Sequence, residues 1–125
     1  MGLSVLVALA GGLGAALRYA VDSAVPDGGP VRVPRGTTAV NLAGSFLAGV
    51  CGGALSAGAA DPAVYAVAVA GFCGGFTTFS TATLEAVLLL ERGQLGRAAG
   101  YALGTLAGTV AAAAVGYAGT ARLLG

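Results

Sequence analysis

The sequence predicts an all-α membrane protein, a single domain over residues 1–125 with four transmembrane helices. Hydrophobic residues make up 57% of the chain and charged residues only 9%, whereas about 25% of the residues in a soluble domain are charged. Four apolar segments are each long enough for the roughly 20 residues with which a helix crosses a bilayer. None of the four alternates apolar and polar residues with the period of a strand, so helices are favoured.

The first predicted helix covers residues 3–24 and is interrupted by Arg18 and Asp22. Its beginning lacks the positive charges of a signal peptide, so we expect it to be retained as a membrane helix. The second predicted helix covers residues 36–60 and contains no charged residue. Residues 26–30, with the sequence PDGGP, form the turn that we expect between these helices.

The third predicted helix covers residues 63–90, and its only charge is Glu85. The fourth covers residues 98–121 and is uncharged. Asp61-Pro62 and the sequence ERGQ at 91–94 mark the turns that precede and follow the third helix. Glycines recur every four residues in the third helix, at 71 and 75, and in the fourth, at 100, 104 and 108. Such spacing favours close packing of helix backbones in lipid.

Composition excludes several classes of function. The net charge of +1 argues against nucleic acid as a partner, since that partner needs a basic face. The chain has no histidine, which rules out a histidine proton switch or metal site. Cys51 and Cys73 lie inside apolar segments, where we interpret them as small packing residues. No nucleophile–base pair, carboxylate pair or phosphate loop is present, so we expect no enzyme.

A break in the third helix is predicted by the sequence GFCGGFTTFSTATLE at residues 71–85. Gly74 and Gly75 disfavour a continuous helix, and the threonine hydroxyls that follow compete for backbone partners. A break in mid-membrane is tolerated only where it is buried or lines a watery cavity. Its freed carbonyls can bind a cation such as Na⁺; a simple kink is the alternative.

Several polar groups inside the predicted helices need an explanation, because such groups are costly in a membrane. Asn41 offers two donors and one acceptor, for function or for an interhelical hydrogen bond. Tyr101, Thr105 and Thr109 share one face of the fourth helix. This row of hydroxyls suits a small dehydrated anion, although hydroxyls also bond back to their own helix.

Arg18 and Glu85 are the membrane charges nearest to a possible functional site. Both lie toward helix ends, so extension of the side chain to the interface is the alternative to a functional role.

Three blocks of the sequence together resemble the Fluc family of fluoride channels, also called CrcB. They are GGLGAALRY at 11–19, GTTAVNLAGSFLAG at 36–49 and GFCGGFTTFST at 71–81. The fourth helix matches through Tyr101, Thr105 and Thr109. The resemblance implies a multi-pass protein of the cytoplasmic membrane that lets cytoplasmic fluoride leave passively and so limits its toxicity.

The same resemblance implies a dual-topology dimer, in which two antiparallel subunits form two fluoride pores. It also implies a structural sodium ion at the dimer centre, not transported, held by the backbone carbonyls of Gly74 and Thr77. Two subunits would supply four carbonyl oxygens, a reasonable cage for a hard monovalent cation.

By this resemblance six residues line the pore and two charges lie at its ends. The pore-lining residues are Asn41, Phe79, Ser80, Tyr101, Thr105 and Thr109, and the charges are Arg18 and Glu85. Hydroxyls, an amide and the positive edge of a phenyl ring can replace the water around fluoride. The family motif commonly continues TTFSTF, whereas this chain has Ala82, so one pore phenylalanine per subunit is missing.

Two rival functions fit a short four-helix chain. A proton-coupled multidrug exporter needs a central membrane carboxylate, usually in the first helix, where this chain has only Asp22 near the end. A membrane assembly protein without transport is disfavoured by the GGFTT sequence and the polar row.

Arginines are distributed unequally between the two predicted ends of the bundle. Arg32, Arg35, Arg92 and Arg97 fall at one end, and Arg122 falls at the other. Cytoplasmic loops carry the excess of Lys and Arg, so we expect both termini to lie outside the cytoplasm. An antiparallel partner would then be a paralogous subunit of opposite bias, which could also supply the phenylalanine absent at Ala82; a homodimer is the alternative.

Overall fold

The computed structural model describes residues 1–26 and 34–125, and every element of secondary structure within them is a helix. Four of its helical spans are long and apolar enough to cross a membrane, which confirms the prediction of a four-helix membrane protein. These spans are Gly2–Ala24, Arg35–Ser56, Pro62–Glu91 and Leu95–Leu124. The predicted turn at 26–30 lies, apart from Pro26, outside the described residues.

Three of the spans are single helices: α1 (Gly2–Ala24), α2 (Arg35–Ser56) and α6 (Leu95–Leu124). The third span contains four elements in succession. They are α3 (Pro62–Ala66), the π-helix η1 (Val67–Cys73), α4 (Gly74–Phe76) and α5 (Phe79–Glu91).

Two glycines and one aspartate set helix boundaries that differ from the predicted ranges. Helix α2 ends at Ser56 rather than near residue 60, because Gly58 adopts a φ of 72° that favours glycine and reverses the chain. Asp61 then caps α3 by accepting a 2.7 Å hydrogen bond from the Ala63 N–H. Gly93, with a φ of 73°, allows α6 to begin at Leu95, earlier than predicted.

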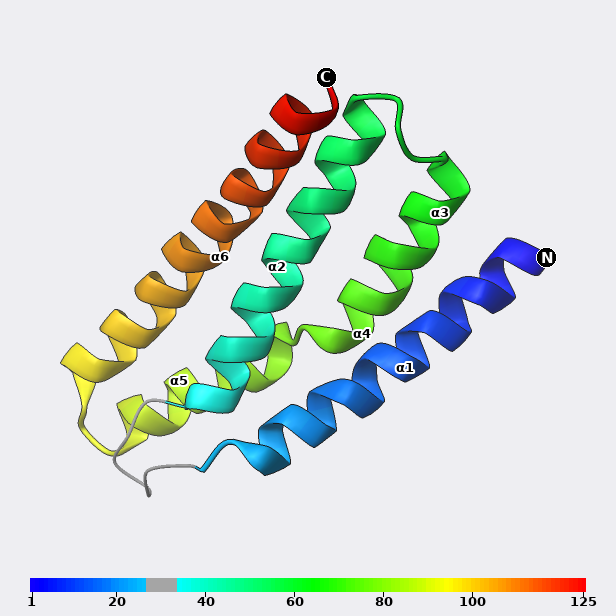
Figure 1. The fold of residues 1–125 in the computed structure, drawn as a ribbon. Coiled ribbons are helices and arrows are strands. Elements are labelled where there is room, and N and C mark those ends of the chain that lie inside the picture. Colours follow the sequence, from blue (N-terminus) through cyan, green and yellow to red (C-terminus); the bar gives the residue numbers. More distant parts are fainter. Residues whose placement is uncertain (27–33) are drawn as a thin grey trace.

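The helices form two closely packed groups (Figure 1). In one group α2 and α6 run side by side in the same direction. In the other group α1 runs along η1 and α4. Helix α5 returns to α6 and so connects the second group to the first.

Glycines permit the close approach in both groups. A Cβ atom on Gly116 would overlap the carbonyl oxygen of Phe46 in α2, and one on Gly75 would overlap that of Gly11 in α1. In contrast, Gly100 and Gly104 have no described atom near the position of an added Cβ. Their face of α6 therefore does not pack within the described chain.

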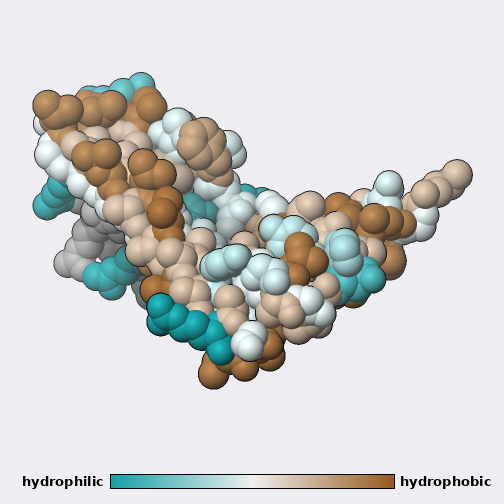
Figure 2. Space-filling view, turned by 90° about the horizontal axis from the view of Figure 1, so that it is seen from above, coloured by the Kyte–Doolittle hydropathy of each residue, from teal (hydrophilic) through white to brown (hydrophobic). Residues whose placement is uncertain are grey.

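The surface of the single chain is large and apolar. Its accessible area is 7158 Å², whereas a compact soluble monomer of this mass exposes about 5,900 Å². Figure 2 shows apolar side chains across the outside and a hollow between two arms of the molecule. Among residues 1–26 and 34–125 five apolar residues are buried: Val40, Cys73, Leu89, Ala98 and Tyr101. So much exposed apolar surface fits a chain surrounded by lipid or by another subunit.

Candidate functional site

Two residues with extended backbone separate α4 from α5. Thr77 has a ψ of 163° and Thr78 has φ and ψ of −148° and 120°. Before them, the N–H and the hydroxyl of Thr77 both donate to the carbonyl oxygen of Cys73, at 2.9 and 2.8 Å. The side chain of Thr77 therefore closes the last turn of α4, and the chain then leaves helical geometry.

Asn41 of α2 holds this extended segment through its side-chain amide. Its Nδ2 donates to the carbonyl oxygen of Thr78 at 3.0 Å, and its Oδ1 accepts from the Thr78 N–H at 2.7 Å. Both residues are buried. The two bonds satisfy both the backbone N–H and the backbone carbonyl of Thr78. This matters because an unpaired buried backbone group is costly.

The backbone N–H groups that a continuous helix would use are redirected here. In an α-helix the N–H of Thr78 would pair with the carbonyl of Gly74, and that of Thr81 with the carbonyl of Thr77. Instead Thr78 donates to Asn41, and Thr81 donates to the Thr78 hydroxyl at 3.2 Å. The carbonyl oxygens of Gly74 and Thr77 have thus lost their helical donors.

The larger of two cavities beside this segment lies between α2, α5 and α6 and has a volume of about 460 Å³. Its lining includes five of the six residues predicted to form a pore: Asn41, Phe79, Tyr101, Thr105 and Thr109. Ser80 is exposed and is not part of the lining. Ala82 does line the cavity, so its small side chain leaves room where the motif has a second phenylalanine.

Besides Thr78, two hydroxyl residues that the sequence did not identify as site residues line the larger cavity. Ser45 lies one helical turn after Asn41, and Thr83 lies one turn after Phe79. The i, i+4 spacing that identified the row on α6 would have found them. Thr83 bonds back to the Phe79 carbonyl at 2.9 Å, so its own donor is already used.

The hydroxyls of the row on α6 differ in their partners. Thr109 bonds back to the carbonyl of Leu106 at 3.0 Å, and Tyr101 donates to Glu85 at 2.7 Å. Thr105 has no side-chain hydrogen bond to the described residues, and it lines the cavity. Of the three, Thr105 therefore retains a free donor for a bound group.

Glu85 joins three helices and contacts Tyr101, which lines the larger cavity. One of its carboxylate oxygens accepts from Thr37 of α2 at 3.0 Å, and the other accepts from Tyr101 of α6 at 2.7 Å. The side chain is directed to these hydroxyls, which accounts for a carboxylate in an apolar helix without extension to the interface.

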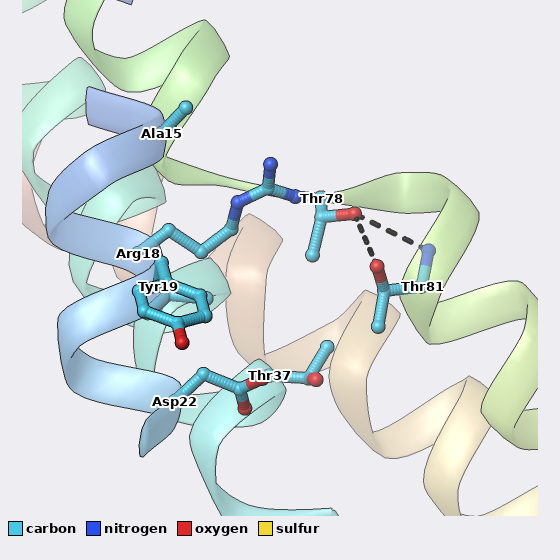
Figure 3. Close-up of a pocket in the computed structure, with 8 residues that line it drawn as sticks. Ala15, Arg18, Tyr19, Asp22, Thr37, Thr78 and Thr81 are labelled. Atoms are coloured by element: carbon cyan, nitrogen blue, oxygen red, sulfur yellow. Dashed lines mark hydrogen bonds between the residues drawn. The ribbon is translucent and has the colours of Figure 1, made fainter. Parts of the chain in front are cut away.

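A smaller cavity of about 260 Å³ lies on the opposite side of the extended segment. Arg18 of α1 lines this cavity rather than the larger one, and its guanidinium extends toward Thr78 (Figure 3). Thr78 lines both cavities. The residue that Asn41 holds is therefore part of the wall between the two cavities.

The comparisons with known proteins agree in pointing to one family. The model of the CrcB-like protein family, described as Camphor Resistance, matches residues 5–117. The fluoride-specific ion channel of Gloeobacter violaceus is 44% identical over 91% of this chain and 92% of its own length. That of Bordetella avium is 50% identical over 74% of this chain and 73% of its own length. That of a Methylobacterium species is 42% identical over 92% of this chain and 93% of its own length.

Replacement of Asn41 by alanine is expected to destabilise the chain. The N–H and carbonyl of Thr78 would remain buried without partners, and each such group costs about 1–3 kcal/mol. Thermal unfolding followed by circular dichroism should show the loss, and amide exchange at Thr78 should accelerate. Thr105→Val is the matched control, since it removes a polar group of the same cavity that has no described partner. Equal stability of Asn41→Ala and Thr105→Val would contradict the role of Asn41.

Proposed function

This chain belongs to the CrcB-like family, and the relatives reported above are fluoride-specific ion channels; we propose that fluoride leaves the cytoplasm passively through the larger cavity of this chain. The observation that carries the proposal is the lining of that cavity. Thr105 with its free hydroxyl, Asn41 with a second amide N–H and Phe79 with its ring all line it. Such groups can replace the hydration shell of a small anion.

The cavity lining favours an anion over a bulky organic substrate. An N–H, an O–H and the positive edge of an aromatic ring all interact favourably with negative charge. Among the described residues no carboxylate lines the larger cavity, and the nearby Glu85 accepts from Thr37 and from the cavity residue Tyr101. Such a lining disfavours a proton-coupled multidrug exporter. A membrane assembly protein would not need the cavity. The chain is a channel and not an enzyme.

We propose that two subunits assemble antiparallel and that each completes the other's pathway. The ring of Phe79 is 87% exposed although it lines the cavity, and the larger cavity is open on one side of the chain. A second subunit against this side would enclose the ring and cover part of the excess apolar surface. The space beside Ala82 would then be available for a phenyl ring from the partner.

A structural sodium ion at the dimer centre fits the backbone of the extended segment. The carbonyl oxygens of Gly74 and Thr77 have lost their helical donors to Asn41 and Thr78. Gly74 is also exposed on the single chain, as a site shared between two subunits requires. Oxygen ligands suit a hard cation. Four carbonyl oxygens from two subunits would hold the sodium ion in place, so that the ion itself would not be transported.

The arginine distribution supports a preferred orientation. The end of α1, the beginning of α2 and the connection α5–α6 lie at one end of the bundle, and the C-terminus lies at the other (Figure 1). Arg35, Arg92 and Arg97 belong to the first end and Arg122 to the second; Arg32 lies outside the described residues. We propose that the first end faces the cytoplasm and that the antiparallel partner is a paralogous subunit of opposite bias.

Phe79→Ala is expected to lower fluoride efflux at least tenfold, because it removes an aromatic group of the pathway. Purified protein in liposomes loaded with fluoride, monitored with a fluoride electrode, gives the measurement. Leu84→Ala, which truncates an exposed side chain of the same helix outside the cavity lining, should leave efflux unchanged. Thr105→Val and Thr109→Val should weaken it less than Phe79→Ala, since neighbouring hydroxyls remain. Efflux by Phe79→Ala equal to that of the parent would place the pathway elsewhere.

Removal of sodium is expected to abolish fluoride efflux, although sodium itself is not transported. Liposomes in which sodium is fully replaced by a bulky organic cation provide the test, with the cation content of the protein measured in parallel. Side-chain changes at Thr77 should act only through backbone geometry, because the proposed ligands are carbonyls. Full efflux from protein that contains no sodium would overturn this part of the proposal.

Single cysteines at the two ends of the bundle are expected to be labelled unequally in intact cells. The background should be Cys51→Ala/Cys73→Ala, since both native thiols are free. With both termini outside, an impermeant thiol reagent should reach a cysteine beside a terminus and not one in the 91–97 loop. Equal labelling of both positions, with the chain expressed alone and active, would instead establish a dual-topology homodimer.

A further inference from the structure

The smaller cavity holds a positive and a negative side chain from the same helix. Arg18 and Asp22 are one turn apart on α1, and both line the cavity. They point in different directions: the guanidinium extends toward Thr78, whereas the carboxylate lies beside Thr37 (Figure 3). In the described part of the chain no ion pair joins them. The two charges therefore act on the cavity separately.

The Asp22 carboxylate lies against the beginning of α2. A Cβ atom on Gly36, the second residue of that helix, would overlap the carboxylate Oδ1 and would lie 3.2 Å from the Asp22 Cα. The absence of a side chain at Gly36 thus creates the space in which the carboxylate sits. The N-terminal turn of a helix carries a partial positive charge, so the carboxylate and the beginning of α2 attract each other.

The hydroxyls around the smaller cavity do not all present donors to it. Thr37 donates to Glu85, so its hydrogen is directed away. Thr81 accepts from the Thr78 hydroxyl at 3.0 Å and keeps its own hydrogen for a guest. An anion in this cavity would find donors in Arg18 and Thr81. It would be repelled by Asp22 directly and by Glu85 behind Thr37.

We propose that Asp22 is a fixed countercharge that limits how strongly the smaller cavity holds an anion drawn in by Arg18. A channel must bind its ion firmly enough for entry and weakly enough for release. A full positive charge together with the free Thr81 hydroxyl favours retention, and a carboxylate one turn away from Arg18 reduces the local potential. The inference rests on the proposed conduction of fluoride: the anion concerned is the permeating ion, which would pass between the larger and the smaller cavity at Thr78, the residue that lines both.

Asp22→Asn tests the proposal, since it removes the charge and keeps the shape of the side chain. The initial rate of fluoride efflux from sodium-containing liposomes is measured over a range of fluoride concentrations. The half-saturating concentration should fall about three- to tenfold, the effect of one unit charge at partly screened distance. The difference should shrink as inert salt is raised, since exposed charges are then screened.

Asp61→Asn is the matched control. It removes the same charge at the other end of the bundle and keeps the cap of α3, which an asparagine also provides. Its half-saturating concentration should equal that of the parent. If Asp22→Asn does not assemble, Asp22→Ser carries the same test. An unchanged or raised half-saturating concentration in the neutral variant would overturn the countercharge. A parent protein that conducts no fluoride would instead overturn the proposed function.

Discussion

The pair of hydrogen bonds between the Asn41 side chain and the Thr78 peptide groups is the interaction on which the rest of the site depends. Extended backbone inside an apolar helix is costly because its N–H and carbonyl groups lose their helical partners. Asn41 replaces both partners of one residue at once. The segment can then depart from helical geometry and separate two cavities, and Thr78 lines each of them.

Glu85, in the middle of α5, also holds the backbone in place through side-chain hydrogen bonds to neighbouring helices. Its two oxygens accept from hydroxyls of α2 and α6, so the helix that follows the extended segment is fixed at its middle as well as at its start. Behind it, Leu89, Ala98 and Tyr101 form a small apolar cluster with Ala82 and Ala86. Polar bonds inside the membrane and close packing thus support the same three-helix junction.

The sequence predicted the number and nature of the helices well, because hydrophobic length alone determines which segments can cross a bilayer. It was less informative about boundaries, since Gly58 and Gly93 act through a φ that composition does not show. For the site, the spacing on α6 identified Tyr101, Thr105 and Thr109, which do share a cavity lining. It could not show that Asn41 uses its amide on a backbone 37 residues away, or that Arg18 faces a second cavity. Those facts arise from packing between helices.

The π-helix η1 has a consequence for insertions and deletions in related chains. A π turn accommodates one more residue than an α turn between the same flanking positions. Loss of one residue from Val67–Cys73 would let the segment return to α geometry while the chain after Gly74 kept its register with Asn41. The preceding α3 would keep the face that it presents, because the wider turn had already absorbed the extra residue. A change of one residue in length here would thus leave both α3 and the two cavities intact.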